Sequence, residues 1–114
     1  MSDACDLTQK HCVPCEGGVD TIGREEAETM LTDVPGWALS DDGKMISRRF
    51  EFKGFLSTMS FINAMAFMVN KENHHPDFSA GYNYCDVGFT THAIDGLSEN
   101  DFICAAKVNA LFEG

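Results

Sequence analysis

Basic residues are scarce in this chain of 114 residues. Lysine and arginine number 8 against 18 aspartate and glutamate residues, which gives a formal net charge of -10 at pH 7. A field of this sign repels phosphate groups, and contacts to phosphate dominate the affinity of proteins for nucleic acids. We therefore expect no direct binding to nucleic acid and none to an anionic membrane.

Long apolar runs are lacking as well. No stretch approaches the roughly 20 apolar residues of a membrane-spanning helix. The first residues, MSDACDLTQK, have neither the basic start nor the apolar middle of a signal peptide. Hydrophobic residues make up 44% and charged residues 23%, as in ordinary globular domains. The sequence predicts one cytoplasmic domain without repeats.

Paired cysteine motifs are few. The chain has five cysteines, an odd number, and Cys5, Cys12 and Cys15 lie near its amino terminus. With His11 they supply four potential metal ligands, but a closed zinc site usually needs a second paired half, which the sequence lacks. Two interpretations stay open: a zinc site, or an exposed arm with free thiols.

Hydrophobic periodicity divides the chain into segments. Residues 1–20 show none, which predicts an irregular arm followed by a single domain over residues 21–114. A short helix is predicted before Pro35-Gly36, on the helical spacing of Ala27, Met30, Leu31 and Val34. A hairpin should follow, with its turn at Asp42-Gly43.

The second strand of this hairpin has one charged residue on its apolar face. Ile46, Phe50 and Phe52 alternate with polar residues, and Arg48 interrupts them. Since buried arginine is rarely unpaired, Arg48 is interpreted either as a strand-end charge or as a contact to a partner.

The longest predicted helix covers residues 55–73. Its apolar residues form two neighbouring stripes: Phe55, Met59, Ile62, Ala66 and Val69, and beside them Phe61, Met65 and Met68. Such stripes are usually core, but this arc is wider than one core contact requires. We interpret the surplus as burial on two sides or as a subunit interface, with the second stripe packed between subunits of a small oligomer.

Two more strands and a last helix are predicted after Pro76. The strands lie around residues 80–82 and over residues 84–92, where Cys85, Val87 and Phe89 share a core face. Ser98 and Asp101 have the spacing of a helix-capping box. The order α-β-β-α-β-β-α predicts an α+β domain, an antiparallel sheet covered by helices.

Three of the four histidines gather in one segment. His74 and His75 stand directly before Pro76, and His92 follows that proline by sixteen residues. The proline forces His75 into an extended conformation while His74 can stay in the helix, so both side chains can reach one pocket. Because histidine titrates near neutral pH, proton transfer is one interpretation. The alternatives are capped or solvated element ends and a zinc triad, although no known zinc-enzyme spacing is present.

The segments ENHHPDF and TTHAIDGLSENDFICAAKVNAL, with Tyr82 between them, closely resemble the pterin-4a-carbinolamine dehydratase family over residues 22–112. The HCVPC arm resembles that of bacterial members. The resemblance implies three helices on one face of a four-stranded antiparallel sheet, and a homodimer or homotetramer. It also implies dehydration of 4a-hydroxytetrahydropterin to quinonoid dihydropterin, a hydro-lyase reaction that recycles the cofactor of aromatic amino-acid hydroxylases. We expect no metal or cofactor, because proton transfer and elimination need no Lewis acid.

The resemblance also assigns site residues by position. His74, His75 and His92 match the family's active-site histidines: acid and base work is expected of His74 and His92, and orientation of the pterin of His75. Phe78 occupies an aromatic place against which a flat ring could pack. Asp101 matches an acidic residue near the site, and both this role and helix capping can hold.

Two positions depart from the animal members, which carry Glu and Arg where this chain has Asn70 and Asn100. Glu72, two residues before His74, is a candidate to compensate in substrate binding. We expect the overall site to stay intact without these two charges, and the efficiency and the pterin side-chain preference to be the properties that can differ. The alternative function is a non-catalytic module that binds a hydroxylase or a transcription factor, since animal members also serve a homeodomain factor. The histidines favour the enzyme, because a scaffold has no chemical need for them.

Overall fold

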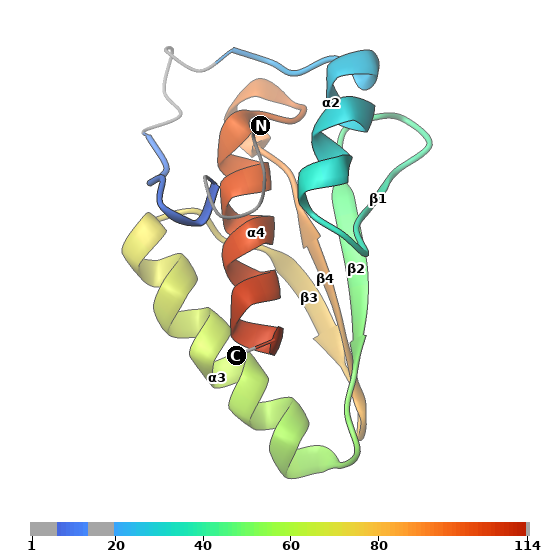
Figure 1. Ribbon diagram of the computed structural model, residues 1–114, viewed down its shortest axis with the longest axis vertical. Helices are drawn as coiled ribbons and strands as arrows, with labels where there is room; N and C mark the ends of the chain where they lie inside the picture. Colours follow the sequence, from blue (N-terminus) through green and yellow to red (C-terminus); the bar gives the residue numbers. More distant parts are fainter. Residues whose placement is uncertain (1–6, 14–19, 114) are drawn as a thin grey trace.

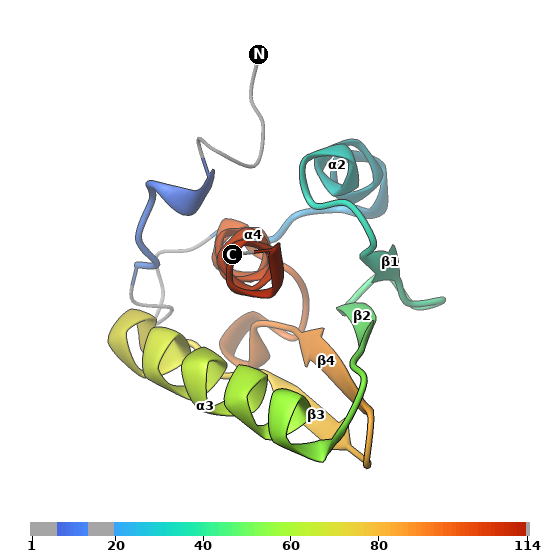
Figure 2. The same ribbon diagram turned by 60° about the horizontal axis from the view of Figure 1, so that its bottom comes forward.

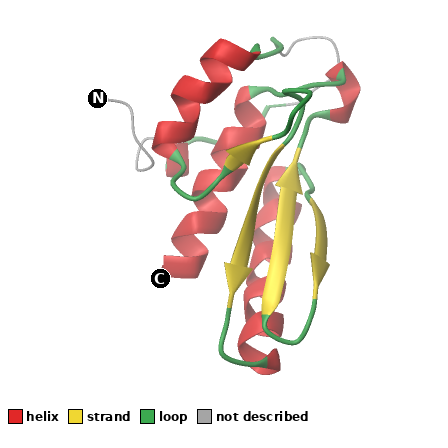
Figure 3. Cartoon of the chain, turned by 90° about the vertical axis from the view of Figure 1, so that its right-hand side faces the viewer, coloured by secondary structure: helices red, strands yellow, loops and turns green. Residues whose placement is uncertain are grey.

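The computed structural model describes residues 7–13 and 20–113, so Cys5 and Cys15 lie outside the described residues. Residues 20–113 form three α-helices on one face of a single antiparallel sheet with strand order β1-β2-β4-β3, which confirms the predicted α+β fold (Figures 1 and 3). No helix in these two ranges is long and apolar enough to cross a membrane. The elements are α2 (Arg24–Met30), β1 (Ala38–Leu39), β2 (Ile46–Glu51), α3 (Phe55–Glu72), β3 (Asp77–Ala80), β4 (Tyr84–Phe89) and α4 (Glu99–Glu113).

The first helix and hairpin form where they are predicted. α2 is continued by a 3-10 turn, Leu31–Asp33, and buries Ala27 and the following Val34 against the core. β1 and β2 pair antiparallel across a turn in which Gly43 has φ +73°. This left-handed conformation is one that side chains disfavour, which explains a glycine at the turn.

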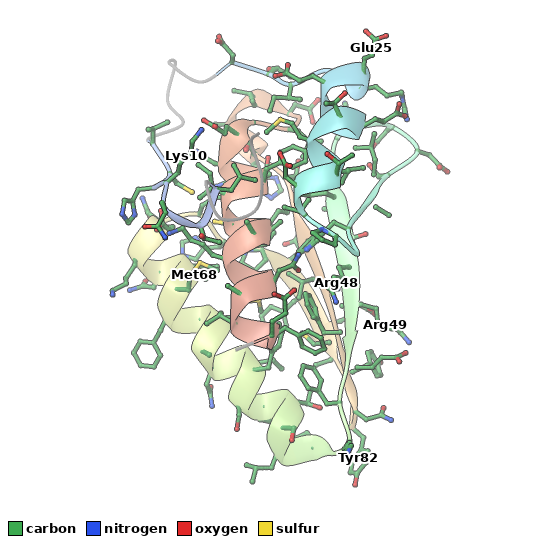
Figure 4. The ribbon with its side chains drawn as sticks, in the orientation of Figure 1. Lys10, Glu25, Arg48, Arg49, Met68 and Tyr82 are labelled. Carbon is green, nitrogen blue, oxygen red and sulfur yellow. The ribbon has the colours of Figure 1, made fainter. Side chains whose placement is uncertain are left out.

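Arg48 has a structural role inside the chain. Its guanidinium donates a hydrogen bond of 2.7 Å to Asn109 Oδ1 on α4 and stacks over the rings of Phe50 and Phe112. Figure 4 shows Arg48 directed toward α4 and the neighbouring Arg49 directed away from the helices. The charge on the apolar face is therefore bound internally, in the middle of a strand and not at its end.

α3 confirms the longest predicted helix, but its two apolar stripes pack differently from the prediction. The first stripe is buried at Ile62 and Val69 and exposed at Phe55 and Ala66. The second stripe faces into the domain, because Phe61 and Met65 are buried. The prediction that the second stripe packs between subunits is therefore wrong. Among the apolar residues that α3 exposes, Leu56 and Phe67 are 80% and 79% accessible.

The second hairpin differs from its prediction in both strands. β3 runs from Asp77 to Ala80 and not over residues 80–82, because residues 81–83 form the turn into β4, where the Gly81 amide donates to the Tyr84 carbonyl at 3.0 Å. β4 buries Cys85 as predicted but ends at Phe89, so His92 is not part of a strand. The chain instead makes a 3-10 turn, His92–Ile94, which is closed by a backbone bridge between Thr91 and Gly96.

α4 begins with the predicted capping box. Ser98 Oγ accepts a hydrogen bond of 3.3 Å from the Asn100 amide, and Asp101 Oδ2 accepts one of 3.0 Å from the Ser98 amide. Each side chain thus satisfies an N–H group that has no partner within the helix. The capping role of Asp101 is confirmed, and its other carboxylate oxygen remains for a second partner.

Residues 7–13 lie beside α4 and the carboxyl end of α3 in both views of the ribbon (Figures 1 and 2). Leu7 is 3% exposed and belongs to the hydrophobic core. Lys107 on α4 donates a hydrogen bond of 3.1 Å to the carbonyl of Thr8. We refer to residues 7–13 as the docked arm.

Candidate active site

The end of α3 directs His74 into the domain. Asn73 adopts the left-handed conformation, with φ 55° and ψ 39°, and the amide of His74 donates to the carbonyl of Val69 at 3.3 Å. This geometry commonly ends helices and turns the chain sharply. The His74 imidazole consequently lies stacked on the ring of Phe89, with 5.9 Å between the ring centroids, and is 7% exposed.

Asp101 is the hydrogen-bond partner of His74. The distance from His74 Nε2 to Asp101 Oδ1 is 2.6 Å. The second oxygen, Oδ2, accepts the hydroxyl of Thr91 at 2.8 Å and the amide of Ser98. The hydroxyls of Thr91 and Ser98 lie 2.8 Å from each other. This buried network fixes the carboxylate and thereby the orientation of the imidazole.

Strand register brings the other two histidines to the same end of the sheet. β3 and β4 pair Asp77 with Gly88. His75 stands two residues before Asp77 and His92 stands four residues after Gly88, so both lie beyond the same end of this strand pair. His75 and His92 are both exposed. The structure therefore gathers the three predicted histidines where β4 ends, one buried and two open to solvent.

A hollow of about 300 Å³ lies beside His92. Its lining residues are Ser40, Asp42, Lys44, Met45, Thr90, His92 and Asp95. Lys44 Nζ lies 2.9 Å from Asp95 Oδ2, and this hydrogen bond raises the pKa of Lys44. The hollow has the size of the smaller ligand pockets in proteins and carries charges of both signs on its wall.

Phe78, the predicted ring-packing residue, lies on the edge strand β3 and is 51% exposed. It lines a second hollow, of about 330 Å³, which shares Met45 with the hollow at His92. Phe78 is therefore accessible to a ligand at the same end of the sheet.

Glu72 is engaged with the docked arm. Its carboxylate accepts a hydrogen bond of 2.7 Å from the Cys12 amide and lies 2.9 Å from Nδ1 of His11. Lys107 Nζ lies 3.3 Å away. Burial raises the pKa of Glu72, but the bonds from Cys12, His11 and Lys107 outweigh that effect and lower the pKa to about 2. Glu72 joins the arm to α3 and α4.

The roles of two residues near the site, Thr91 and Asn100, were not predicted from the sequence. Thr91 supports the carboxylate of Asp101, and its only signal in the sequence is its place before His92. Asn100 binds the backbone of Val13 in both directions, accepting its amide at 3.1 Å and donating to its carbonyl at 2.9 Å. Asn100, which stands where animal members carry an arginine, thus binds the docked arm.

Of the two possible metal sites, the one at the three histidines lies within the described residues and the one in the amino-terminal segment lies there only in part. Among residues 7–13 and 20–113, no three His, Cys, Asp or Glu side chains gather as the ligands of one metal ion would. The set of Cys5, His11, Cys12 and Cys15 includes two residues outside these ranges.

Known proteins with similar sequences share one family description. Residues 20–111 match the model of the family "Pterin 4 alpha carbinolamine dehydratase". A protein of Nitrosomonas europaea, provisionally named a pterin-4-alpha-carbinolamine dehydratase, is 54% identical over 114 residues, which cover 99% of each chain. A protein of Halorhodospira halophila with the same provisional name is 52% identical and covers 92% of this chain and 96% of its own.

Two solved structures are similar in fold. A transcriptional coactivator/pterin dehydratase from Brucella melitensis superposes with a TM-score of 0.77 and 33% identity, over 81% of this chain and 98% of its own. A pterin dehydratase-like protein described as a RuBisCO assembly factor of the alpha-carboxysome has a TM-score of 0.59 and 25% identity, over 67% of this chain and 88% of its own.

Proposed function

The chain belongs to the pterin 4 alpha carbinolamine dehydratase family, and we propose that it dehydrates 4a-hydroxytetrahydropterin to quinonoid dihydropterin in the cytoplasm. The observation that supports this most is the buried His74–Asp101 pair, with two further histidines at the same end of the sheet. A carboxylate that orients an imidazole is a common arrangement for proton transfer. The product would return to the cofactor cycle of an aromatic amino-acid hydroxylase.

The reaction requires two proton transfers. The bond between C4a and the hydroxyl oxygen breaks, the C4a–N5 double bond forms, and the N5 proton is removed while the departing hydroxyl gains one. We assign these transfers to His74 and His92, whose side chains approach from the buried and the open side of the site. Asp101 holds His74 in place and stabilises its protonated form by charge. The network of Thr91 and Ser98 keeps Asp101 fixed during turnover.

The pterin is proposed to bind across the end of the sheet. His75 precedes β3 by two residues, and Phe78 offers an exposed aromatic side chain on that edge strand. The hollow beside His92 has room for part of the ligand. In this arrangement His75 orients the ring, and the wall formed by Lys44 and Asp95 meets the substituent of the pterin.

The direct test is turnover by the purified full chain. 4a-Hydroxytetrahydropterin, generated in place by a hydroxylase, dehydrates slowly without a catalyst, so added protein should accelerate formation of the quinonoid product in proportion to its concentration. An unchanged rate at micromolar protein would contradict the proposed function.

A second role in protein association is favoured by the surface of α3. Leu56 and Phe67 are three helical turns apart and strongly exposed, and a hollow of about 430 Å³ lies between Leu56 and Phe112. Exposed apolar side chains of this kind often mark protein interfaces. We propose that this face joins copies of the chain into a homodimer or homotetramer, and that binding of a hydroxylase or a transcription factor is the alternative use of the same face.

A further inference from the structure

Two thiols that the proposed reaction does not use face each other between the docked arm and α4. Cys12 Sγ lies 3.6 Å from Cys104 Sγ, although the two residues are 92 positions apart in the sequence. Cys12 is half-buried and Cys104 is buried. A disulfide has a bond length of about 2.05 Å, so the sulfurs need to approach by only about 1.5 Å. We propose that Cys12 and Cys104 form a reversible disulfide that clamps the docked arm onto α4.

Hydrogen bonds hold the arm in place before any covalent bond forms. The Val13 backbone binds the Asn100 side chain in both directions, and the Cys12 amide donates to Glu72. Closing a long loop normally costs conformational entropy, which these contacts have already offset in the thiol form. The two sulfurs therefore meet as neighbours and not as the ends of a free chain.

The surroundings of the two sulfurs give them different parts in the reaction. The hydrogen bond with Cys12 and burial both raise the pKa of Cys104, which keeps it a thiol at neutral pH. Cys12 is the less buried of the two residues, so it meets the oxidant first. Cys104 is the resolving thiol, and its Sγ also lies 3.9 Å from the carbonyl of His74.

The oxidant is a peroxide, and the steps balance. The Cys12 thiolate attacks one oxygen of hydrogen peroxide, the O–O bond breaks, and a sulfenic acid and hydroxide are formed. The hydroxide formed in this step takes the proton of Cys104, and the Cys104 thiolate then displaces the hydroxyl group from Cys12, so the S–S bond forms as the S–O bond breaks. The protons of the two thiols leave in two molecules of water. A dithiol reductant reverses the modification by exchange.

The clamp would act on the two elements that position the histidine pair. Cys104 lies on α4 one turn after Asp101, and the arm binds Glu72 two residues before His74. Oxidation removes the local opening in which the arm separates from α3 and α4. We expect slower amide hydrogen exchange at Cys12 and Val13 and at the ends of both helices that the arm contacts.

The experiment uses the full chain with Cys5→Ser, Cys15→Ser and Cys85→Ala, which leaves only the proposed pair. One equivalent of hydrogen peroxide should lower the intact mass by about 2 Da, the mass of two hydrogens lost as the disulfide forms. Dithiothreitol should restore the mass. The oxidised form should melt at least about 5 °C higher, because the bond closes a long loop in the unfolded chain. Adding Cys12→Ser, a change at a half-buried position, should abolish both effects.

The wild-type chain supplies the decisive comparison, because Cys12 also belongs to a Cys-x-x-Cys motif. Peptide mapping after peroxide should find Cys12 joined to Cys104. Pairing of Cys12 with Cys15, irreversible oxidation of Cys12, or thiols that stay free would each overturn the proposal. So would a bound zinc ion whose removal by a chelator frees the two thiols. These outcomes do not depend on pterin turnover, so the proposal and the dehydratase function can fail separately.

Discussion

Nε2 of His74 lies 2.6 Å from Oδ1 of Asp101, and the two side chains are 7% and 0% exposed. One carboxylate thereby caps α4 and holds the imidazole at the end of α3. Because both groups are buried, the bond fixes their relative position far better than a surface pair would. Helix capping and orientation of the histidine are thus one arrangement and not alternatives.

Asp101→Asn removes the negative charge of Asp101 and keeps the shape of its side chain. We expect kcat to fall about 100-fold or more, because the neutral amide cannot stabilise a protonated imidazole, while KM changes less. The nitrogen NMR signals of the His74 ring should also change, which a purely structural role of Asp101 would not require. Thr91→Val is the matched control, since it removes one hydrogen bond from the same carboxylate but leaves its charge; we expect a loss below about tenfold. Equal losses in the two variants would contradict the role given to the charge.

Replacement of the histidines tests the acid and base assignment. His74→Ala and His92→Ala should each lower kcat by about 10² to 10⁴, the usual contribution of a positioned proton-transfer group. The double variant should lose much less than the product of the two, because groups that act together are not additive. His75→Ala should raise KM more than it lowers kcat.

His11→Ala is the control for this series, because His11 is exposed and binds Glu72 and not Asp101. Its turnover should stay within about twofold of the wild type. The variants are compared at equal circular dichroism and oligomer size. Near-normal turnover of both His74→Ala and His92→Ala would show that the histidines have structural roles or are merely solvated.

The element order could be predicted because it depends on local patterns. Apolar spacing marks α3, and the Ser98–Asp101 spacing marks the start of α4, since both signals lie within one element. The 3-10 turn at His92 was not predicted. It depends on a backbone bridge between Thr91 and Gly96 and on the left-handed conformation of Asp95. No period in the sequence encodes such a turn.

The composition of the site was less predictable than the fold. The histidines could be found from their spacing and family resemblance, whereas the docked arm depends on contacts between residues far apart in the chain. Cys12 binds Glu72 across 60 positions and approaches Cys104 across 92. An irregular segment with no periodicity gives no sign of the surface that it covers, so the engagement of Glu72 became visible only in three dimensions.

Glu72 predicts how stability depends on pH. Its pKa is about 2 in the folded chain and ordinarily 4.5, so its contribution is complete above about pH 5 and is lost as the pH falls through 4.5 toward 2. The shift corresponds to on the order of 3 kcal/mol at neutral pH. Glu72→Gln should therefore lower the unfolding free energy, measured in urea, at pH 7 but much less at pH 2.5. Glu99→Gln, which removes an exposed pair with Lys10, should change it by less than about 1 kcal/mol.

Removal of metal should leave turnover unchanged, since elimination by proton transfer needs no Lewis acid. The check is dialysis against a strong chelator followed by assay with and without added zinc. The double variant Cys5→Ser, Cys15→Ser removes two potential zinc ligands of the amino-terminal segment and leaves the histidines intact. This is preferable to deleting residues 1–20, because Leu7 belongs to the core. Activity that collapses on dialysis and returns with zinc in this variant would support a metal held by the histidines.

The exposed side chains of Leu56 and Phe67 predict that the chain forms an oligomer, and a charged residue introduced at this surface should dissociate it. Both residues lie on the exposed side of α3, and burying them between copies would remove apolar surface from water. Light scattering at micromolar concentration should therefore give a mass of at least two chains of 12.5 kDa. Phe67→Asp should shift this mass toward the monomer, because an unpaired carboxylate is costly in an apolar interface. Asn63→Asp, on the same exposed side of the helix, adds the same charge at a residue that is already polar and should have a smaller effect. A wild-type monomer would refute assembly through this face, and an oligomer unaffected by Phe67→Asp would place the interface elsewhere on the chain.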